Sequence, residues 1–402
     1  ELLGMATTPP TLHLYPRADG PGSSQDLPQF AAMGNRFPLR APDWDDPAWS
    51  WSSRCLRTLG ACIDGAPIVF RALPAENPDA YEYYAPDFHS SPVVLTGEVP
   101  GRPEYFVHNI LQQFGLVGVR IEADPMPSIY RGTGLGGSNL AHAAALIFAS
   151  ALSGADLSLG QIYVAGTQLE NLFGVSCDEH GHISYGVSMT GGQEALAALQ
   201  GGFCDNVHVP LTHGPFAVVS RPLVEPQDYA RFAEHMTLVN VGVRRGAGVT
   251  SSQVNTVWMQ QWLSAEGTAL HRQKAELAYL AAEALRAQDW SAYVQSVAAY
   301  RRLREQLCPA YIAGQEELAQ FCAQTGAEYF PLGAGTGTCL VVAAEAGVTA
   351  AIAAQVDASA DPQLGRTALP FRIRARGLDC FNFAENGLAE PTPPQSIDST
   401  SE

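Results

Sequence analysis

Lysine is almost absent from this sequence. Lys274 is the one lysine among 402 residues, although Lys and Arg together number 23. Walker A phosphate loops need a lysine beside their glycines, and protein kinases need one on a strand. Lys274 has neither context and falls in a segment that reads as an exposed helix, which also disfavours a Schiff-base mechanism. Arginine, metal ions or backbone N–H groups must therefore carry any cationic role.

Long apolar runs and an excess of basic residues are also missing. No stretch of about 18 uncharged apolar residues occurs, so nothing reads as a membrane span. The 40 Asp and Glu residues give a net charge of -17, which repels phosphate backbones and argues against nucleic-acid partners. Hydrophobic residues make up 46%, enough for a buried core. The length suits one large or two mid-sized domains.

The eight cysteines form no CxxC motif, which excludes the commonest zinc and redox signatures. Their wide spacing in a core-rich chain is typical of reduced, mostly buried thiols. We therefore expect a cytoplasmic protein and not a secreted disulfide scaffold. The cysteines are Cys55, Cys62, Cys177, Cys204, Cys308, Cys322, Cys339 and Cys380.

The hydrophobic pattern predicts a mixed first half and a helix-rich second half. A strand is expected at 118–124, a buried Ala-rich helix at 140–152, and a helix that ends near Phe173 after the N-cap candidates Asp156 and Ser158. A short helix is expected within 50–62.

In the second half, strands are predicted at 215–221 and 238–243, and mostly helix over 251–325. A closing strand is predicted at 370–376. The Pro/Ser/Thr-rich end of the chain, from Pro391, is expected to be disordered.

A first glycine-rich segment precedes the buried helix, with four glycines in the six residues 132–137. A turn that enters a helix aims backbone N–H groups and the helix dipole at one point, and this arrangement binds anions. Ser138 stands at the helix start, where its hydroxyl can ligate a metal ion or simply cap the helix. The segment predicts a phosphate site.

The same segment satisfies GxGxxG through Gly132, Gly134 and Gly137, so a dinucleotide site is the formal rival. Asp156 lies at roughly the distance that a Rossmann unit requires of its acidic residue. However, Asp156 precedes a helix, whereas that unit places the acid at the end of its second strand. This mismatch favours the phosphate interpretation.

Two further glycine segments follow. Gly191 and Gly192 lead into a short helix whose second residue is Glu194, a carboxylate that can act as metal ligand, as base or as an ordinary helix-start residue. Residues 333–338 (GAGTGT) link two predicted strands and could equally be a hairpin turn. Three such segments in a lysine-poor chain together favour a nucleoside triphosphate held by backbone groups and Mg²⁺.

The order of these motifs resembles the GHMP small-molecule kinases, in particular the branch of L-fucokinase and D-glycero-D-manno-heptose 7-phosphate kinase. Residues 134–138 are similar to the family's Gly-Leu-Gly-Ser-Ser loop, with its second serine at Ser138. Residues 193–203 match without a gap a family pattern that ends in Gly-Gly-Phe, and residues 333–338 look like the third motif. The start of the chain, LLGMATTPP, resembles the first motif with one deletion.

The resemblance implies a fold and a domain order. The expected fold is α+β, with an N-terminal ribosomal-protein-S5-like α/β domain over 1–222 and a C-terminal ferredoxin-like, helix-rich domain over 223–385. Residues 386–402 are expected to form a disordered tail. The first strand of the N-terminal domain is expected upstream of Glu1.

The resemblance also implies a reaction, in which ATP and Mg²⁺ serve to phosphorylate a sugar hydroxyl at the anomeric carbon. Glu194 and Ser138 would be catalytic and would ligate Mg²⁺, and Gly191, Gly192 and Thr7 would bind the sugar or sugar phosphate. A homodimer or a fusion to a nucleotidyltransferase domain is left open. The expected ATP-binding residues are Gly132, Thr133, Gly134, Leu135, Gly136, Gly137, Ser138, Asn139, Gly333, Gly335 and Gly337.

Two acidic positions depart from the family pattern. The catalytic aspartate is replaced by Glu194, and the substrate-side aspartate of the first motif falls on Thr7. These changes favour, as the alternative, a pseudokinase that keeps the fold for binding or assembly. Asp205 is a reserve candidate for the base. Asp178, Glu179, His180 and His182 read as a solvated loop rather than a metal cluster, and His142 as a packed helix residue.

Overall fold

The computed structural model describes twelve stretches of the chain, and all structural statements below concern these residues. They are 8–22, 56–96, 103–126, 138–173, 175–177, 183–185, 193–209, 217–242, 265–307, 315–332, 337–359 and 366–392.

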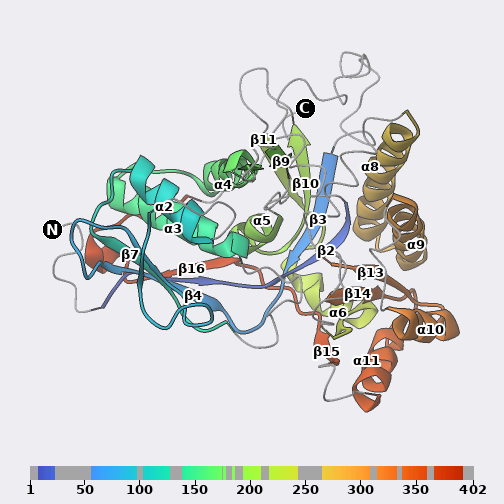
Figure 1. The fold of residues 1–402 in the computed structure, drawn as a ribbon. Coiled ribbons are helices and arrows are strands. Elements are labelled where there is room, and N and C mark those ends of the chain that lie inside the picture. Colours follow the sequence, from blue (N-terminus) through green and yellow to red (C-terminus); the bar gives the residue numbers. More distant parts are fainter. Residues whose placement is uncertain are drawn as a thin grey trace.

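A six-stranded sheet, here sheet A, forms one end of the molecule in the order β16–β1–β4–β7–β5–β6 (Figure 1). Its central strands β4 and β7 alternate buried and partly exposed positions, and every buried position holds an apolar residue. The expected strand at 118–124 is confirmed as β7. The strands are β1 (Thr11–Leu14), β4 (Ile68–Pro74), β5 (Glu82–Tyr84), β6 (Val93–Val94), β7 (Val119–Ala123) and β16 (Leu378–Phe381).

Helices α2 (Pro103–Gln113) and α3 (Ser138–Ser153) lie together above sheet A (Figure 1). Helix α4 (Leu159–Phe173) follows α3 directly. Both expected helices of this region are confirmed. Ser158 caps α4 as predicted: its backbone N–H donates to Gln161 Oε1 (2.9 Å), and the Gln161 N–H donates to Ser158 Oγ (3.3 Å).

A four-stranded sheet, sheet B, occupies the centre in the order β11–β10–β3–β2. Helix α5 (Gln193–Gln200) contacts β3, and α8 (Ala265–Arg286) contacts β2 and β3. Helix α9 (Trp290–Leu307) pairs with α8 beside this sheet (Figure 1). The strands are β2 (Arg17–Gly22), β3 (Leu56–Cys62), β10 (Phe203–Val209) and β11 (Ala217–Pro222). A separate hairpin pairs β8 (Val175–Cys177) with β9 (Ile183–Tyr185).

A third sheet, sheet C, belongs to the second half of the chain and has the order β13–β14–β12–β15. Helices α6 (Tyr229–His235), α10 (Glu316–Thr325) and α11 (Val348–Ala358) pack on it (Figure 1). The short 3-10 helices η6 (Pro226–Asp228) and η8 (Ala384–Asn386) complete the elements. The strands are β12 (Met236–Asn240), β13 (Glu328–Pro331), β14 (Thr338–Val342) and β15 (Thr367–Pro370).

Two expected elements were wrong. The helix expected within 50–62 is strand β3 over its described part, because residues 57–62 are buried on both faces of a central strand and not along one face of a helix. The strand expected over 370–376 does not form there. That segment instead crosses the end of β3, where the Arg374 N–H donates to Cys62 O (2.9 Å) and the Asp64 N–H donates to Arg372 O (2.7 Å).

The two halves of the chain share one sheet. Strand β1 lies between β4 and β16, with Thr11 opposite Arg71 on one side and Phe381 on the other. Residues just after η8 are also bonded: the Leu388 N–H donates to Phe383 O (2.9 Å), and Thr392 O accepts the Leu159 N–H (3.0 Å). Residues 393–402 lie outside the described residues. The domain boundaries stay a prediction.

Candidate functional site

Ser138 begins helix α3, as predicted, and the helix behind it is embedded in the core. Residues 140–149 are all at most 4% exposed. The small alanine side chains let α2, α4 and α5 approach α3 closely, and this packing fixes the position of α3. The glycine segment 132–137 lies outside the described residues, as does the side chain of Ser138. The structure therefore describes the helix that follows the predicted phosphate site, and the site itself stays a prediction.

Glu194 is the second residue of helix α5, which starts at Gln193. Residues 195–199 of this helix are buried, and the helix packs against both α3 and β3. The helices that follow the first and second glycine segments are thus in contact. Gly191, Gly192 and the side chain of Glu194 lie outside what is described, so the distance between Glu194 and Ser138 stays a prediction.

The third glycine segment joins two strands of a hairpin, as predicted. Strands β13 and β14 pair antiparallel, and the Leu332 N–H donates to Thr338 O (2.8 Å) at the end of the ladder. Gly337 is described and accepts the Val241 N–H (3.0 Å), while Gly333 and Gly335 lie outside the described residues. The side chain of Thr338 is fully buried, and its hydroxyl has no hydrogen-bond partner among the described residues.

Strand β2 relates the second and third segments to each other. It contacts α5 and also contacts β14. The elements that carry Glu194 and Gly337 therefore share a neighbour, and α5 also contacts α3. The described parts of the three predicted segments belong to one connected group of elements.

A buried polar layer, which the sequence reasoning missed, lies on the face of sheet B that α4 and α5 cover. The Tyr163 hydroxyl and His208 Nε2 are 3.1 Å apart, and the Ser220 hydroxyl donates to Asn206 Oδ1 (2.7 Å). Gln200 at the end of α5 also bonds Ser220. The signal was present in β10, whose seven residues include three polar side chains. Such buried networks hold an element in one orientation, here α5.

Asp205 points to the other face of sheet B and is occupied by ion pairs. Its Oδ2 lies 3.2 Å from Arg57 and 2.5 Å from Arg286 of α8, and Asp205 is 1% exposed. The Arg57 guanidinium also lies 5.0 Å from the ring centre of Tyr279. These contacts favour a structural role and weaken Asp205 as a reserve base.

Lys274 was expected on an exposed helix, and this was wrong. It is 1% exposed, because α8 presents that face to β2 and β3 and not to solvent. His142 is confirmed as a packed helix residue, 4% exposed, with its ring centre 4.4 Å from that of Phe106.

The described cysteines are free, as expected. Burial raises the pKa of the Cys62 thiol to about 12 and that of Cys322 to about 12. Thiols with raised pKa values stay protonated and are poor nucleophiles. The described residues contain no group of His, Cys, Asp and Glu that could hold a metal ion, and the segment with Asp178 and His180 lies outside them. Thr7 also lies outside.

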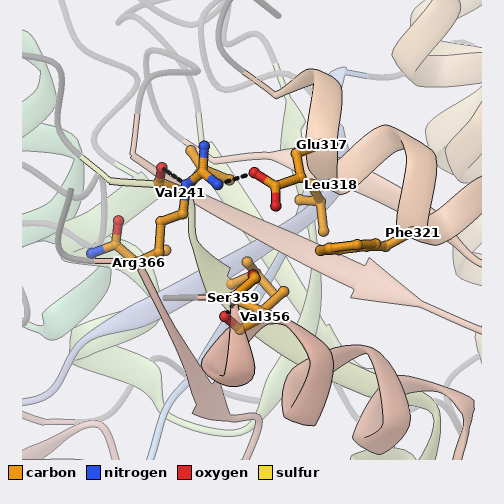
Figure 2. A pocket seen from close by; sticks show the side chains of 9 residues that line it. Val241, Glu317, Leu318, Phe321, Val356, Ser359 and Arg366 are labelled. Carbon is orange, nitrogen blue, oxygen red and sulfur yellow. Dashed lines mark hydrogen bonds and ion pairs between the residues drawn. The ribbon is translucent and has the colours of Figure 1, made fainter. Parts of the chain in front are cut away.

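Two hollows occur among the described residues of the second half. A groove of about 500 Å³ runs between α6, α11 and β15, and alanines make up five of its fifteen lining residues. A cavity of about 20 Å³ lies beside Arg366, between the end of β12, α10 and α11 (Figure 2). Neither is lined by Ser138 or Glu194. Within the described stretches, no helix is long and apolar enough to cross a membrane.

Comparison with known proteins identifies the fold. No protein-family model matches the sequence, and no curated protein matches it. Among solved structures, the chain is similar to a putative sugar kinase from Campylobacter jejuni, with 16% identity and a TM-score of 0.57. That match covers 94% of this chain and 99% of the other.

Two further structures match over nearly their whole length. Mevalonate diphosphate decarboxylase from Staphylococcus aureus matches with 11% identity and a TM-score of 0.60, covering 93% of this chain and 98% of that one. A D-glycero-D-manno-heptose 1-phosphate kinase from Bacteroides thetaiotaomicron matches with 14% identity and a TM-score of 0.52, covering 92% and 98%. The chain therefore has the α+β fold of the GHMP kinases, as predicted. The branch is not resolved at these identities.

Proposed function

We propose that this protein is an ATP-dependent kinase that phosphorylates a hydroxyl of a sugar or sugar phosphate, as expected at the anomeric carbon. One observation carries the proposal. Helices α3 and α5, which follow the first two glycine segments, pack on each other within a fold shared with sugar and heptose kinases. A cytoplasmic location is part of the proposal.

The residues assigned to the reaction suit its chemistry. Residues 132–138 would present backbone N–H groups at the start of α3, where the helix dipole adds a partial positive charge. This supplies positive potential without lysine, which agrees with the near absence of lysine. Gly333, Gly335 and Gly337 would let backbone approach the phosphates from the other side.

Ser138 and Glu194 would hold Mg²⁺, since hydroxyl and carboxylate oxygens are its preferred ligands. When bound, the metal neutralises charge on the transferring phosphoryl group. Glu194 would also accept the proton of the attacking hydroxyl. The burial of residues 195–199 and the polar layer around Gln200 would keep this carboxylate in place. Gly191, Gly192 and Thr7 are proposed to contact the sugar.

The second candidate function is a pseudokinase that binds nucleotide or assembles with partners without transfer. The replacement of the family aspartate by Glu194 favours it. The ion pairs that occupy Asp205 strengthen it, because they weaken the reserve candidate for the base.

A thermal-shift and phosphotransfer screen with ATP-Mg²⁺, free sugars and sugar phosphates tests the proposal. A shift with ATP together with transfer to one sugar supports the kinase. A shift without transfer to any sugar or sugar phosphate supports the pseudokinase. Gly136→Val should abolish the ATP shift, because its side chain would occupy space that phosphate oxygens need. Gly160→Val is the matched control, since a Cβ there meets no atom closer than 4.0 Å. ATP binding by a folded Gly136→Val protein would place the phosphate site elsewhere.

A further inference from the structure

The end of the third glycine segment is held by a chain of contacts that starts at Arg366. Gly337 O accepts the Val241 N–H (3.0 Å), and Val241 O accepts the Arg366 Nε–H (3.3 Å). The Arg366 guanidinium is also ion-paired with Glu317 of α10. Figure 2 shows the guanidinium between the Val241 carbonyl and the Glu317 carboxylate. Four residues from separate parts of the chain thus form one series of contacts that ends at Gly337.

Val241 is a short link in this chain. It follows the last residue of β12, and Asn240 Oδ1 accepts the Gly242 N–H (2.9 Å), which forms a local turn. Gly242 has a φ of 89°, a left-handed conformation that favours glycine. The Val241 peptide therefore leaves the sheet here, and Arg366 supplies a partner for its carbonyl beyond the strand ladder.

Arginine suits this task better than other residues. Its planar group presents several N–H donors in fixed directions, so one side chain can bond a carbonyl and a carboxylate at once. Leu318, Phe321 and Val356 line the cavity beside it and limit the positions open to the side chain (Figure 2).

The exposure of the pair shows what kind of contribution to expect. The Arg366 side chain is 20% exposed and that of Glu317 is 42% exposed. Ion pairs this accessible add little to global stability, because water screens them. Breaking the pair should therefore leave the protein folded and change mainly the position of the peptide that Arg366 holds.

We propose that Arg366 and Glu317 are positioning residues that fix the Gly337–Thr338 end of the third glycine segment and thereby set the affinity for the phosphates of ATP. This inference rests on the proposed function. Glycine peptides have wide conformational freedom, so contacts from outside help to hold Gly337 in one geometry. The contacts from Val241 and Arg366 are such outside supports.

Arg366→Gln, Arg366→Lys and Glu317→Gln test this inference, with Arg302→Gln on the exposed face of α9 as the matched control. The first measurement is amide hydrogen exchange of the ligand-free full-length protein. Peptides that cover Val241 and Gly337–Leu340 should exchange faster in Arg366→Gln, and those of α9 should not change. Arg366→Lys should give exchange rates between those of the parent and Arg366→Gln, since lysine keeps the positive charge but lacks the planar guanidinium with its several N–H donors.

The second measurement is calorimetric binding of ATP-Mg²⁺ and of adenosine. Arg366→Gln should weaken ATP binding by up to about tenfold, because the protein loses the arginine hydrogen bond to the Val241 carbonyl and no direct bond to ATP, and leave adenosine binding unchanged. Equal loss for ATP and adenosine would overturn the phosphate assignment. Unchanged exchange at Gly337 in Arg366→Gln would overturn the positioning role itself. A parent protein that binds neither ligand would instead overturn the proposed function, and the phosphate part of this inference with it.

Discussion

Gly201 and Gly377 lie so close together that neither position has room for a side chain. A Cβ on Gly201 would lie 2.5 Å from the Gly377 nitrogen, and one on Gly377 would lie 2.6 Å from the Gly201 nitrogen. The neighbouring Gly202 N–H donates to Arg374 O (2.7 Å). The segment that returns from the second half of the chain is thereby held against the end of α5. Helix α5 carries Glu194 at its other end.

Gly377→Ala should destabilise the protein by about 3 kcal/mol, because the methyl group would collide with the backbone of α5 at Ala198 O, 2.5 Å away. The free energy of unfolding in urea measures this. Gly160→Ala is the control, since it has an ordinary φ and open space, and it should change stability by less than about 1 kcal/mol. Equal stability of the Gly377→Ala protein and the parent would contradict the close approach.

Ser138→Ala should reduce turnover at saturating ATP and Mg²⁺ more than it reduces ATP affinity. A lost metal ligand should cost roughly 1–3 kcal/mol of transition-state stabilisation, like other hydrogen bonds to charged groups. If Ser138 only caps α3, the substitution should instead lower stability by about 1 kcal/mol and leave kcat unchanged. Steady-state kinetics and urea unfolding separate the two roles. Ser153→Ala at the other end of α3 serves as control.

Glu194→Gln should lower phosphotransfer by about a thousandfold while ATP still binds, because the amide cannot accept the hydroxyl proton. Glu194→Asp should also lose activity, since a retracted carboxylate moves by about 1 Å, which costs on the order of a hundredfold. Phosphate transfer to the sugar and ATP binding are the measurements, and the exposed Glu345→Gln is the control. If the parent is a pseudokinase, it should transfer no phosphate. Any effect of Glu194→Asp would then be a gain of phosphotransfer. If the parent phosphorylates a sugar and the Glu194→Gln protein does so equally well, both hypotheses fail: Glu194 as the base, and the pseudokinase.

Buried thiols should make the protein less stable in alkaline solution. Burial raises the pKa of Cys62 and of Cys322 from 9.0 to about 12 in the folded state. Above about pH 9 the unfolded chain releases these protons and the folded protein keeps them, so stability falls as the pH rises from about 9 toward 12. Each thiol should contribute about 1.4 kcal/mol per pH unit in that window. Urea unfolding at a series of pH values measures the slope, and Cys62→Ala should reduce it by one thiol's share.

The hydrophobic pattern of the sequence predicted those elements that have one continuous apolar face or a clear alternation of apolar and polar residues. The run from Leu140 to Leu152 reads as a buried helix, and α3 is one. The pattern misled at Leu56–Cys62, where a central strand is buried on both faces and includes Arg57, so apolar residues do not alternate. It also misled at Lys274, whose burial depends on sheet B, formed by strands far away in the chain.

The candidate site was predictable only in part for the same reason. Glycines before Ser138 and Glu194 identify two helix starts, but contact between α3 and α5 is a tertiary property that neither segment encodes alone. The link from Gly337 through Val241 to Arg366 and Glu317 joins four residues that lie far apart in the sequence or on different segments. No local spacing indicates such a link.

Strand β1 lies between β4 and β16, and the Tyr15 hydroxyl donates to Asp379 across 364 positions of sequence. During synthesis on the ribosome, sheet A therefore cannot be completed until residues 378–381 have emerged. Until then one edge of β1 exposes unpaired backbone groups, which is a hazard for pairing with other chains. Nascent chains of this protein should need protection at that edge until residues 378–381 have left the ribosome, and a ribosome that stalls before this point would leave the edge open.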